Sequence, residues 1–315
     1  MINFVSSKST NSTPTNSIVL IRRMALGIAI ATWMVMAIGS ATRIMNAGLA
    51  CPDWPLCYGT ILPAEQMNLQ VFLEWFHRLV ASSVGFAAIA LCSASWYFRK
   101  SLPKWLPWAT SGSLSLVIVQ GGLGGLTVTQ LLRFDIVTAH LGTGLLFFSS
   151  LLAIATALSS RTGEVQSTPK LAWLGLTAVI FVYLQSILGA LVASQWALHQ
   201  CFATQDMCIV LNTHLLGVIP ATFASIALVV TSLLTKVISP ILRRVSVIAG
   251  LLVIAQVAIG YATYKLHLQV EPLTVAHQAI GSALLGTLVC FTVLAFRAIN
   301  QNPTLEQNQA QTAIR

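Results

Sequence analysis

Charged residues are scarce in this sequence, and acidic ones are the scarcest. Asp and Glu together number 8 among 315 residues, and all charged residues make up 8% of the chain. A soluble domain carries roughly 25% charged residues, so this chain cannot cover a water-facing surface. The composition excludes a soluble globular protein, and most of the surface must face lipid.

Two common signatures of metal and thiol chemistry are also missing. None of the six cysteines is spaced as C-x-x-C, the arrangement of redox dithiols. Zinc prefers three or four clustered ligands, and no cysteine or carboxylate completes such a set in both halves of the chain. Neither a C-x-x-C dithiol nor a zinc site is therefore expected.

Long apolar runs are what the sequence has in abundance, since 56% of its residues are hydrophobic. A membrane-spanning helix needs about 20 apolar residues, and these runs are too long and uniform for barrel strands. The sequence predicts an all-α membrane protein with eight transmembrane helices. We expect them at about 23–44, 73–97, 108–129, 136–158, 171–193, 210–235, 245–265 and 273–296.

The net charge of +9 is explained by topology rather than by a nucleic-acid partner. With the N-terminus in the cytoplasm, thirteen Lys and Arg fall on inner segments, and an inner excess of this kind sets orientation in membranes. The four on the outer side are Arg43, Arg78, Arg133 and Lys265. We therefore expect a multi-pass protein of the cell membrane with both termini cytoplasmic. Residues 1–22 are predicted to be a disordered tail, and residues 298–315 a polar one.

The chain contains an internal repeat. His77 and His140 lie 63 residues apart, as do His214 and His277, and the two pairs are offset by 137 residues. The segments LVIVQGGLGGL (116–126) and LVIAQVAIGYA (252–262) align within one residue of the same offset. Residues 23–160 and 171–297 are therefore predicted to be two pseudo-repeated four-helix bundles that run in the same direction.

The four repeated histidines fall near the outer ends of even-numbered spans. Taken singly, each would be a hydrogen-bonded core residue more often than a ligand. Duplication at one depth changes this interpretation, because ionisable groups in membranes are expensive and usually functional. Two imidazoles facing each other across a four-helix bundle suit heme iron. His77, His140, His214 and His277 are therefore the predicted axial ligands, whereas His199 and His267 break the repeat and are read as incidental.

The two halves differ beside the first histidine. Glu74 precedes His77 by one helical turn, and the repeat replaces Glu74 by Leu211 and Arg78 by Leu215. A carboxylate near a heme edge can move protons or stabilise developing positive charge, so Glu74 is the candidate catalytic residue. The alternative is a structural pair between Glu74 and Arg78. Likewise, Arg43 and Arg78 either pair with heme propionates or extend to the interface.

Four of the cysteines lie in two outer loops. Cys51 and Cys57 share the first loop, and Cys201 and Cys208 share the second. Because exported surroundings are oxidising, we expect one disulfide within each loop. Each disulfide staples its loop over a site, or the first exchanges electrons. Cys92 and Cys290 lie within spans and are read as packing residues.

A resemblance to a known family rests on these same residues. The stretch GSATRIMNAGLACPDWPLCYG, at residues 39–59, resembles the first-loop signature of heme A synthases. So do Glu74-x-x-His77-Arg78, the three later histidines and the Cys201/Cys208 loop. The resemblance extends from about residue 23 to residue 297. The CPDWPLC loop together with four spaced histidines is a specific combination.

The resemblance implies an enzyme that oxidises the C8 methyl of heme O to a formyl group, giving heme A for cytochrome oxidase. His77 and His140 would then flank the substrate heme O, His214 and His277 would hold a heme B, and Glu74 would be the essential acid. A heme O synthase is the implied partner. The electron partner is undefined, and a homo-oligomer is compatible with the sequence.

Two other functions share part of the pattern. A bis-His membrane cytochrome b that carries electrons would use the four histidines, but it would explain neither Glu74 nor the CPDWPLC loop. A transporter or heme-export module would favour broken spans or charges near mid-membrane. The spans are apolar there apart from Gln120, Gln185 and Gln256.

Overall fold

A computed structural model describes residues 16–159, 167–193, 205–266 and 269–299, and for residues 205–208 it describes the backbone alone. Within these residues the chain forms long α-helices and one short 3-10 helix, η1 (Ala64–Gln66). The long helices are α1 (Asn16–Ile44), α2 (Leu69–Tyr97), α3 (Leu106–Thr129), α4 (Phe134–Ala157), α5 (Pro169–Val192), α7 (Gln205–Leu234), α8 (Pro240–Lys265) and α9 (Glu271–Ile299). All eight contain a segment long and apolar enough to cross a membrane, which confirms the predicted all-α class with eight spans.

The first helix begins earlier than the sequence analysis expects. Residues 16–22, assigned there to a disordered tail, form the first two turns of α1. The physical reason is the apolar run from Ile18 to Ile21, which extends the span before the Arg22–Arg23 pair. Ile21 is fully buried in the core, so these turns pack against the protein. Residues 1–15 lie outside the described part of the chain.

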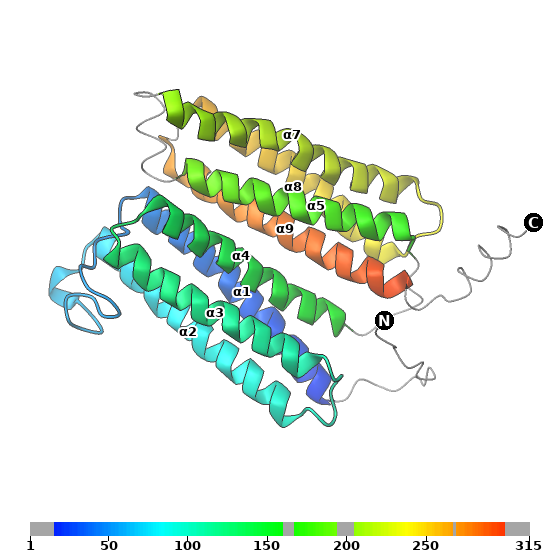
Figure 1. Ribbon diagram of the computed structural model, residues 1–315, viewed down its shortest axis with the longest axis horizontal. Coiled ribbons are helices and arrows are strands. Elements are labelled where there is room, and N and C mark those ends of the chain that lie inside the picture. Colours follow the sequence, from blue (N-terminus) through cyan, green and yellow to red (C-terminus); the bar gives the residue numbers. More distant parts are fainter. Residues whose placement is uncertain (1–15, 160–166, 194–204, 267–268, 300–315) are drawn as a thin grey trace, which may run out of the picture.

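The helices are arranged as two groups of four, one from each half of the sequence (Figure 1). In the first group α1 packs on α2 and α4, and α3 packs on α2 and α4; in the second, α5 packs on α7 and α9, and α8 packs on α7 and α9. When α1, α2, α3 and α4 are replaced in order by α5, α7, α8 and α9, every pair of the first group becomes a pair of the second. The contacts are therefore those of a repeat that runs in one direction.

The two groups meet through α1 and α4 on one side and α5 and α9 on the other. Phe147 of α4 and Phe291 of α9 are among the largest fully buried side chains. The indole of Trp33 on α1 donates to the carbonyl oxygen of Ala279 on α9 at 2.9 Å. At the other end of α9, Arg297 donates to the carbonyl of Thr156 on α4 at 2.5 Å. The interface between the two groups combines apolar burial with hydrogen bonds near both ends of α9.

Large apolar side chains also cover the outside of the molecule. Phe86, Ile118, Leu216 and Ile254 are each about two thirds exposed or more. In water such a surface would be strongly unfavourable, because each buried Å² of apolar area is worth roughly 25 cal/mol. Facing lipid, it costs nothing of this kind. The outward faces agree with the multi-pass membrane protein expected from composition.

Candidate heme sites

The four repeated histidines lie at one end of the molecule. Each falls within the first three turns of its helix, and these helices run in the same direction: His77 on α2, His140 on α4, His214 on α7 and His277 on α9. The imidazoles of His77 and His140 are close enough to interact electrostatically, and so are those of His214 and His277. Each four-helix group thus brings its own histidine pair together.

Each histidine ring packs against a glycine of the neighbouring helix. A Cβ atom added to that glycine would lie 3.3 Å or less from the Cε1 atom of the ring. The pairs are Gly39 with His77 at 2.7 Å, Gly124 with His140 at 3.3 Å, Gly189 with His214 at 3.1 Å and Gly260 with His277 at 2.6 Å. The glycines let the backbone approach the imidazole, so helix–helix packing sets the position of each ring.

The histidine pairs have the chemistry that heme ligation requires. The Nδ1 atoms of His77, His140 and His277 are buried and have no hydrogen-bond partner among the described residues. Buried polar atoms usually have a partner, so these unpaired nitrogens are compatible with ligation of a further group. The described residues contain no cluster of three or more His, Cys, Asp or Glu side chains. A porphyrin supplies four iron ligands itself and needs only two imidazoles, which fits these pairs better than a zinc-type site.

Three of the four histidines have a glutamine partner, which the sequence analysis did not assign. Gln120 of α3 approaches His140 Nε2 at 3.2 Å, Gln185 of α5 approaches His214 Nδ1 at 3.0 Å, and Gln256 of α8 approaches His277 Nε2 at 3.3 Å. In each contact the carboxamide nitrogen faces a ring nitrogen. These are the mid-span polar residues that stand out in an otherwise apolar sequence.

A compact loop joins α1 to α2 at the histidine end of the first half. Cys51 and Cys57 form a disulfide there, which confirms the first predicted pair. Both cysteines are almost fully buried, and Val71 of α2 packs with them. Trp54 lies on Gly125 of α3, where an added Cβ would be 3.2 Å from the indole. The loop is therefore fixed to both α2 and α3.

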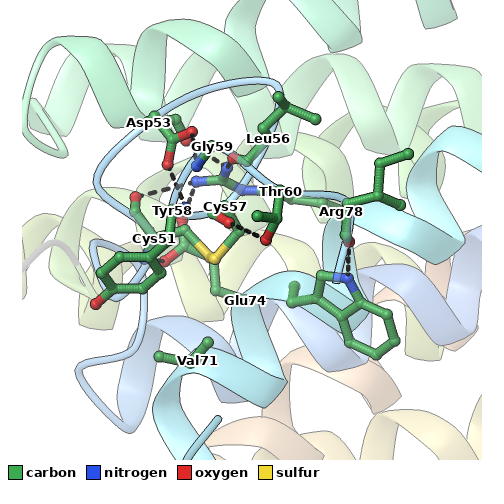
Figure 2. Close-up of a disulfide and its surroundings, with 12 residues drawn as sticks. Cys51, Asp53, Leu56, Cys57, Tyr58, Gly59, Thr60, Val71, Glu74 and Arg78 are labelled. Carbon is green, nitrogen blue, oxygen red and sulfur yellow. Dashed lines mark hydrogen bonds and ion pairs between the residues drawn. A yellow bond between two sulfur atoms is a disulfide. The ribbon is translucent and has the colours of Figure 1, made fainter. Parts of the chain in front are cut away.

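Arg78 clamps this loop to α2 (Figure 2). Its Nη1 donates to the carbonyl oxygens of Asp53 at 2.6 Å and Leu56 at 2.5 Å, and Nη2 donates to that of Cys51 at 3.3 Å. Nη2 also pairs with Glu74 Oε1 at 2.5 Å, and the Arg78 side chain is only 14% exposed. The guanidinium is thus used within the protein, where the sequence analysis predicted a propionate partner or an interfacial side chain.

Glu74 connects the same loop to α2, one turn before His77. It is 3% exposed, and its second oxygen, Oε2, accepts the backbone N–H of Cys51 at 2.8 Å. The structural pair with Arg78, kept open as the alternative to catalysis, is therefore present. Since Glu74 lies one turn before His77, the carboxylate also links the disulfide to the helix that carries this ring.

Asp53 closes the loop on itself. Its two oxygens accept the backbone N–H groups of Tyr58 at 2.6 Å and Gly59 at 2.8 Å. These N–H groups, that of Gly59 first, hold the pKa of the Asp53 carboxyl below its usual value of 3.8. Gly59 has φ of 70°, a conformation that favours glycine. No pattern in the sequence predicts this role for Asp53.

The remaining predicted site residues are placed as follows. Arg43 lies half-buried in the last turn of α1, and no hydrogen bond joins it to another described side chain. Its proposed role toward a propionate stays a prediction. Cys92 and Cys290 are free and lie within spans, as expected. The side chains of Cys201, Cys208, His199 and His267 are outside the described residues, so the second disulfide stays a prediction.

The chain matches the model of a known protein family. Residues 22–289 match the COX15-CtaA family, described as cytochrome oxidase assembly protein. The chain belongs to this family. The match covers all four histidines and both cysteine loops, so it includes the whole of the candidate site.

Individual relatives carry the name heme A synthase. The one from Shewanella oneidensis is 28% identical, with 82% of this chain and 91% of the relative covered. The one from Rhizorhabdus wittichii is 24% identical, with 83% and 90% covered. A protoheme IX farnesyltransferase from Haloarcula marismortui is 31% identical over a shorter match, which covers 45% of this chain and 29% of that protein. The predicted membership of the heme A synthase family is thereby confirmed.

Proposed function

We propose that this member of the family is a heme A synthase that oxidises the C8 methyl of heme O to a formyl group. The proposal rests above all on one observation. Both halves hold a pair of histidines, but only the first pair has a carboxylate–guanidinium pair beside it. Two matched cofactor positions with unequal surroundings suit an enzyme in which one position holds the substrate. The enzyme would be an oxidoreductase acting on a CH3 group.

In this proposal the substrate heme O occupies the first half, between His77 and His140. Glu74 is the only buried acid among the described residues. Its charge is balanced by Arg78, and its position one turn from His77 suits stabilisation of positive charge that develops as the methyl group is oxidised. The loop held by Arg78 would limit water access from the outer side.

The second half would hold a resident heme B between His214 and His277. Such a heme supplies one-electron chemistry when bound. The protein's contribution there is to hold two neutral imidazoles in a dry, apolar bundle. The equivalents of Glu74 and Arg78 are Leu211 and Leu215, so no charge from these positions adjoins this pair. This suits electron transfer better than a reaction on the ligand.

The expected setting is the cell membrane, with both termini in the cytoplasm and the histidine end outside. A heme O synthase is the expected partner, since the substrate must be farnesylated before it arrives. The partial likeness to protoheme IX farnesyltransferases supports a related pathway. Eight lipid-facing helices suit a lipophilic substrate.

The test is co-expression with a heme O synthase in a host that lacks heme A. Hemes are extracted from the purified protein and identified by chromatography and mass spectrometry. Heme A, or its hydroxymethyl precursor, is the expected product. Heme B alone, with heme O available in the membrane, would replace the proposal by the bis-His electron carrier.

Glu74→Gln is expected to retain both hemes and to lower product formation about 100-fold or more, the range for loss of a positioned acid or base. The matched control is Glu65→Gln, which changes an exposed carboxylate in η1 of the same loop. Heme content and heme A yield are measured on the same preparations. Unchanged yield in Glu74→Gln would remove the catalytic assignment.

A further inference from the structure

The two-fold repeat conceals a finer, four-fold one. Each histidine helix pairs with the helix before it: α1 with α2, α3 with α4, α5 with α7, and α8 with α9. In every pair, the glycine that touches the ring lies on the preceding helix. The position compared between these pairs, that of the partner residue, is four residues before this glycine. The four segments are VMAIG (35–39), QGGLG (120–124), QSILG (185–189) and QVAIG (256–260).

The geometry supports this alignment independently. All four rings lie beside the backbone carbonyl of the residue at that position, which is Val35, Gln120, Gln185 or Gln256. Three of these residues are glutamines whose side chains add a second polar contact to the ring, at 3.0 to 3.3 Å. The fourth is Val35, whose side chain has no polar group, so only its backbone carbonyl lies beside the His77 ring.

The histidine helices match this difference. Where the partner is glutamine, a glycine follows the histidine by three or four residues: Gly144, Gly217 or Gly281. A methyl group there would come within 3.1 Å of the carboxamide. Where the partner is Val35, the residue four after His77 is Ala81. Glutamine and glycine thus occur together in three of the helix pairs, and in the fourth pair valine replaces the glutamine and alanine replaces the glycine.

We propose that Gln120, Gln185 and Gln256 are positioning residues that lock the imidazoles of His140, His214 and His277, and that Val35 leaves His77 unlocked. This inference rests on the proposed function. The C-terminal heme then has two locked ligands and stays in place. The N-terminal heme has one locked ligand and one exchangeable ligand, as a site must when its heme enters as substrate and leaves as product.

The polar atoms of the lock are suited to this role. Each glutamine has a buried Oε1 without a partner among the described residues. When iron takes the lone pair of a ring, the other ring nitrogen carries a proton, and the carboxamide accepts it only when its oxygen, rather than the nitrogen, is turned toward the ring. For His214 the glutamine faces Nδ1 and leaves Nε2 for iron, whereas for His140 and His277 it faces Nε2 and leaves Nδ1. The Nε2 atom of Gln185 also donates to the carbonyl of His214 at 2.8 Å, a bond that is given up when the carboxamide turns its oxygen to the ring.

The test uses the full-length, heme B-loaded protein and follows transfer of its heme to an excess of apo-globin. Wild type is expected to lose heme in a fast phase and a slow phase. Gln256→Leu should speed the slow phase about 10- to 100-fold, the usual cost of losing a partner of a metal-bound histidine. It should also shift the EPR g values of the low-spin ferric heme, because these depend on the angle between the imidazole planes. Gln278→Leu is the control, since Gln278 neighbours His277 on α9 but has no hydrogen bond to a described histidine.

A gain-of-function variant keeps the test decisive if Gln256→Leu does not fold. Val35→Gln combined with Ala81→Gly builds the missing lock, and it should slow the fast phase about tenfold. Val35→Gln alone should not, because the Ala81 methyl occupies the space of the carboxamide. Heme-loss phases and g values that are the same in the variants and in wild type would overturn the proposed lock. Slower heme loss from Gln256→Leu would overturn it too, because glutamine would then compete with iron for the ring nitrogen. Wild-type protein that binds no heme would instead overturn the proposed function.

Discussion

Replacing Arg78 by alanine is expected to let an external reductant cleave the Cys51–Cys57 disulfide on the order of 100 times faster. The disulfide is buried, so reduction requires the loop to open first. Removing one partner of a buried ion pair costs about 3 kcal/mol or more. Here the loss of the guanidinium also leaves three loop carbonyl groups without this hydrogen-bond donor. Since 1.4 kcal/mol is a factor of ten, the open population rises by about two orders of magnitude.

The chain offers a matched control in Arg133→Ala. Arg133 also pairs with an acid, Asp135 at 2.7 Å, but the two side chains are 59% and 47% exposed. An exposed pair of this kind contributes about 0–1 kcal/mol, so this variant should be reduced at nearly the wild-type rate. The measurement is thiol labelling against time in a membrane-impermeant reductant, read by mass spectrometry. Equal rates for the two variants would show that Arg78 does not hold the loop closed.

Arg78 also separates the two roles of Glu74. If Glu74 acts only by holding the loop, then Arg78→Ala and Glu74→Gln disturb one network, and their effects on heme A yield should not add. If Glu74 also stabilises charge in the reaction, then Glu74→Gln should lower the yield even where the disulfide stays protected. Comparing yield with the reduction rate distinguishes a clamp from a catalytic residue.

The helices could be predicted from the sequence because lipid imposes a simple rule. A span must be apolar for about 20 residues and must satisfy its own backbone, so hydropathy alone locates it. The repeated histidines were equally visible, since their spacing does not depend on side-chain geometry. The charged pair Arg22–Arg23 predicts a later start for α1 than the structure has, because it is typical of a span boundary, although Ile21 before it is buried.

The loop between α1 and α2 could not be derived in the same way. Its conformation depends on which carbonyls a single guanidinium reaches, and nothing periodic in residues 45–68 encodes that choice. The glutamine partners are an intermediate case. Their signal, Gln four residues before Gly, is present three times in the sequence, but the ring contacts that give it meaning are seen only when neighbouring helices are placed side by side.

Gly39→Ala is expected to remove heme from the first half while sparing the second. The new methyl group would lie 2.7 Å from Cε1 of His77, closer than carbon atoms approach without displacement. The imidazole must therefore move, and the proposed role of His77 as an axial ligand tolerates little movement. We expect at least a tenfold loss of heme from the N-terminal site and a corresponding loss of heme A production.

Two further glycine variants make this result specific. Gly27→Ala lies on the same helix with nothing within 4 Å, so it should bind heme normally and gain about 0.5–1 kcal/mol of helix stability. Gly260→Ala would place its methyl 2.6 Å from Cε1 of His277, so it should empty the second half instead. Optical and EPR spectra of the three purified variants would show which heme each one retains. Loss of the same heme in Gly39→Ala and Gly260→Ala would contradict separate sites in the two halves, because the two rings belong to different bundles.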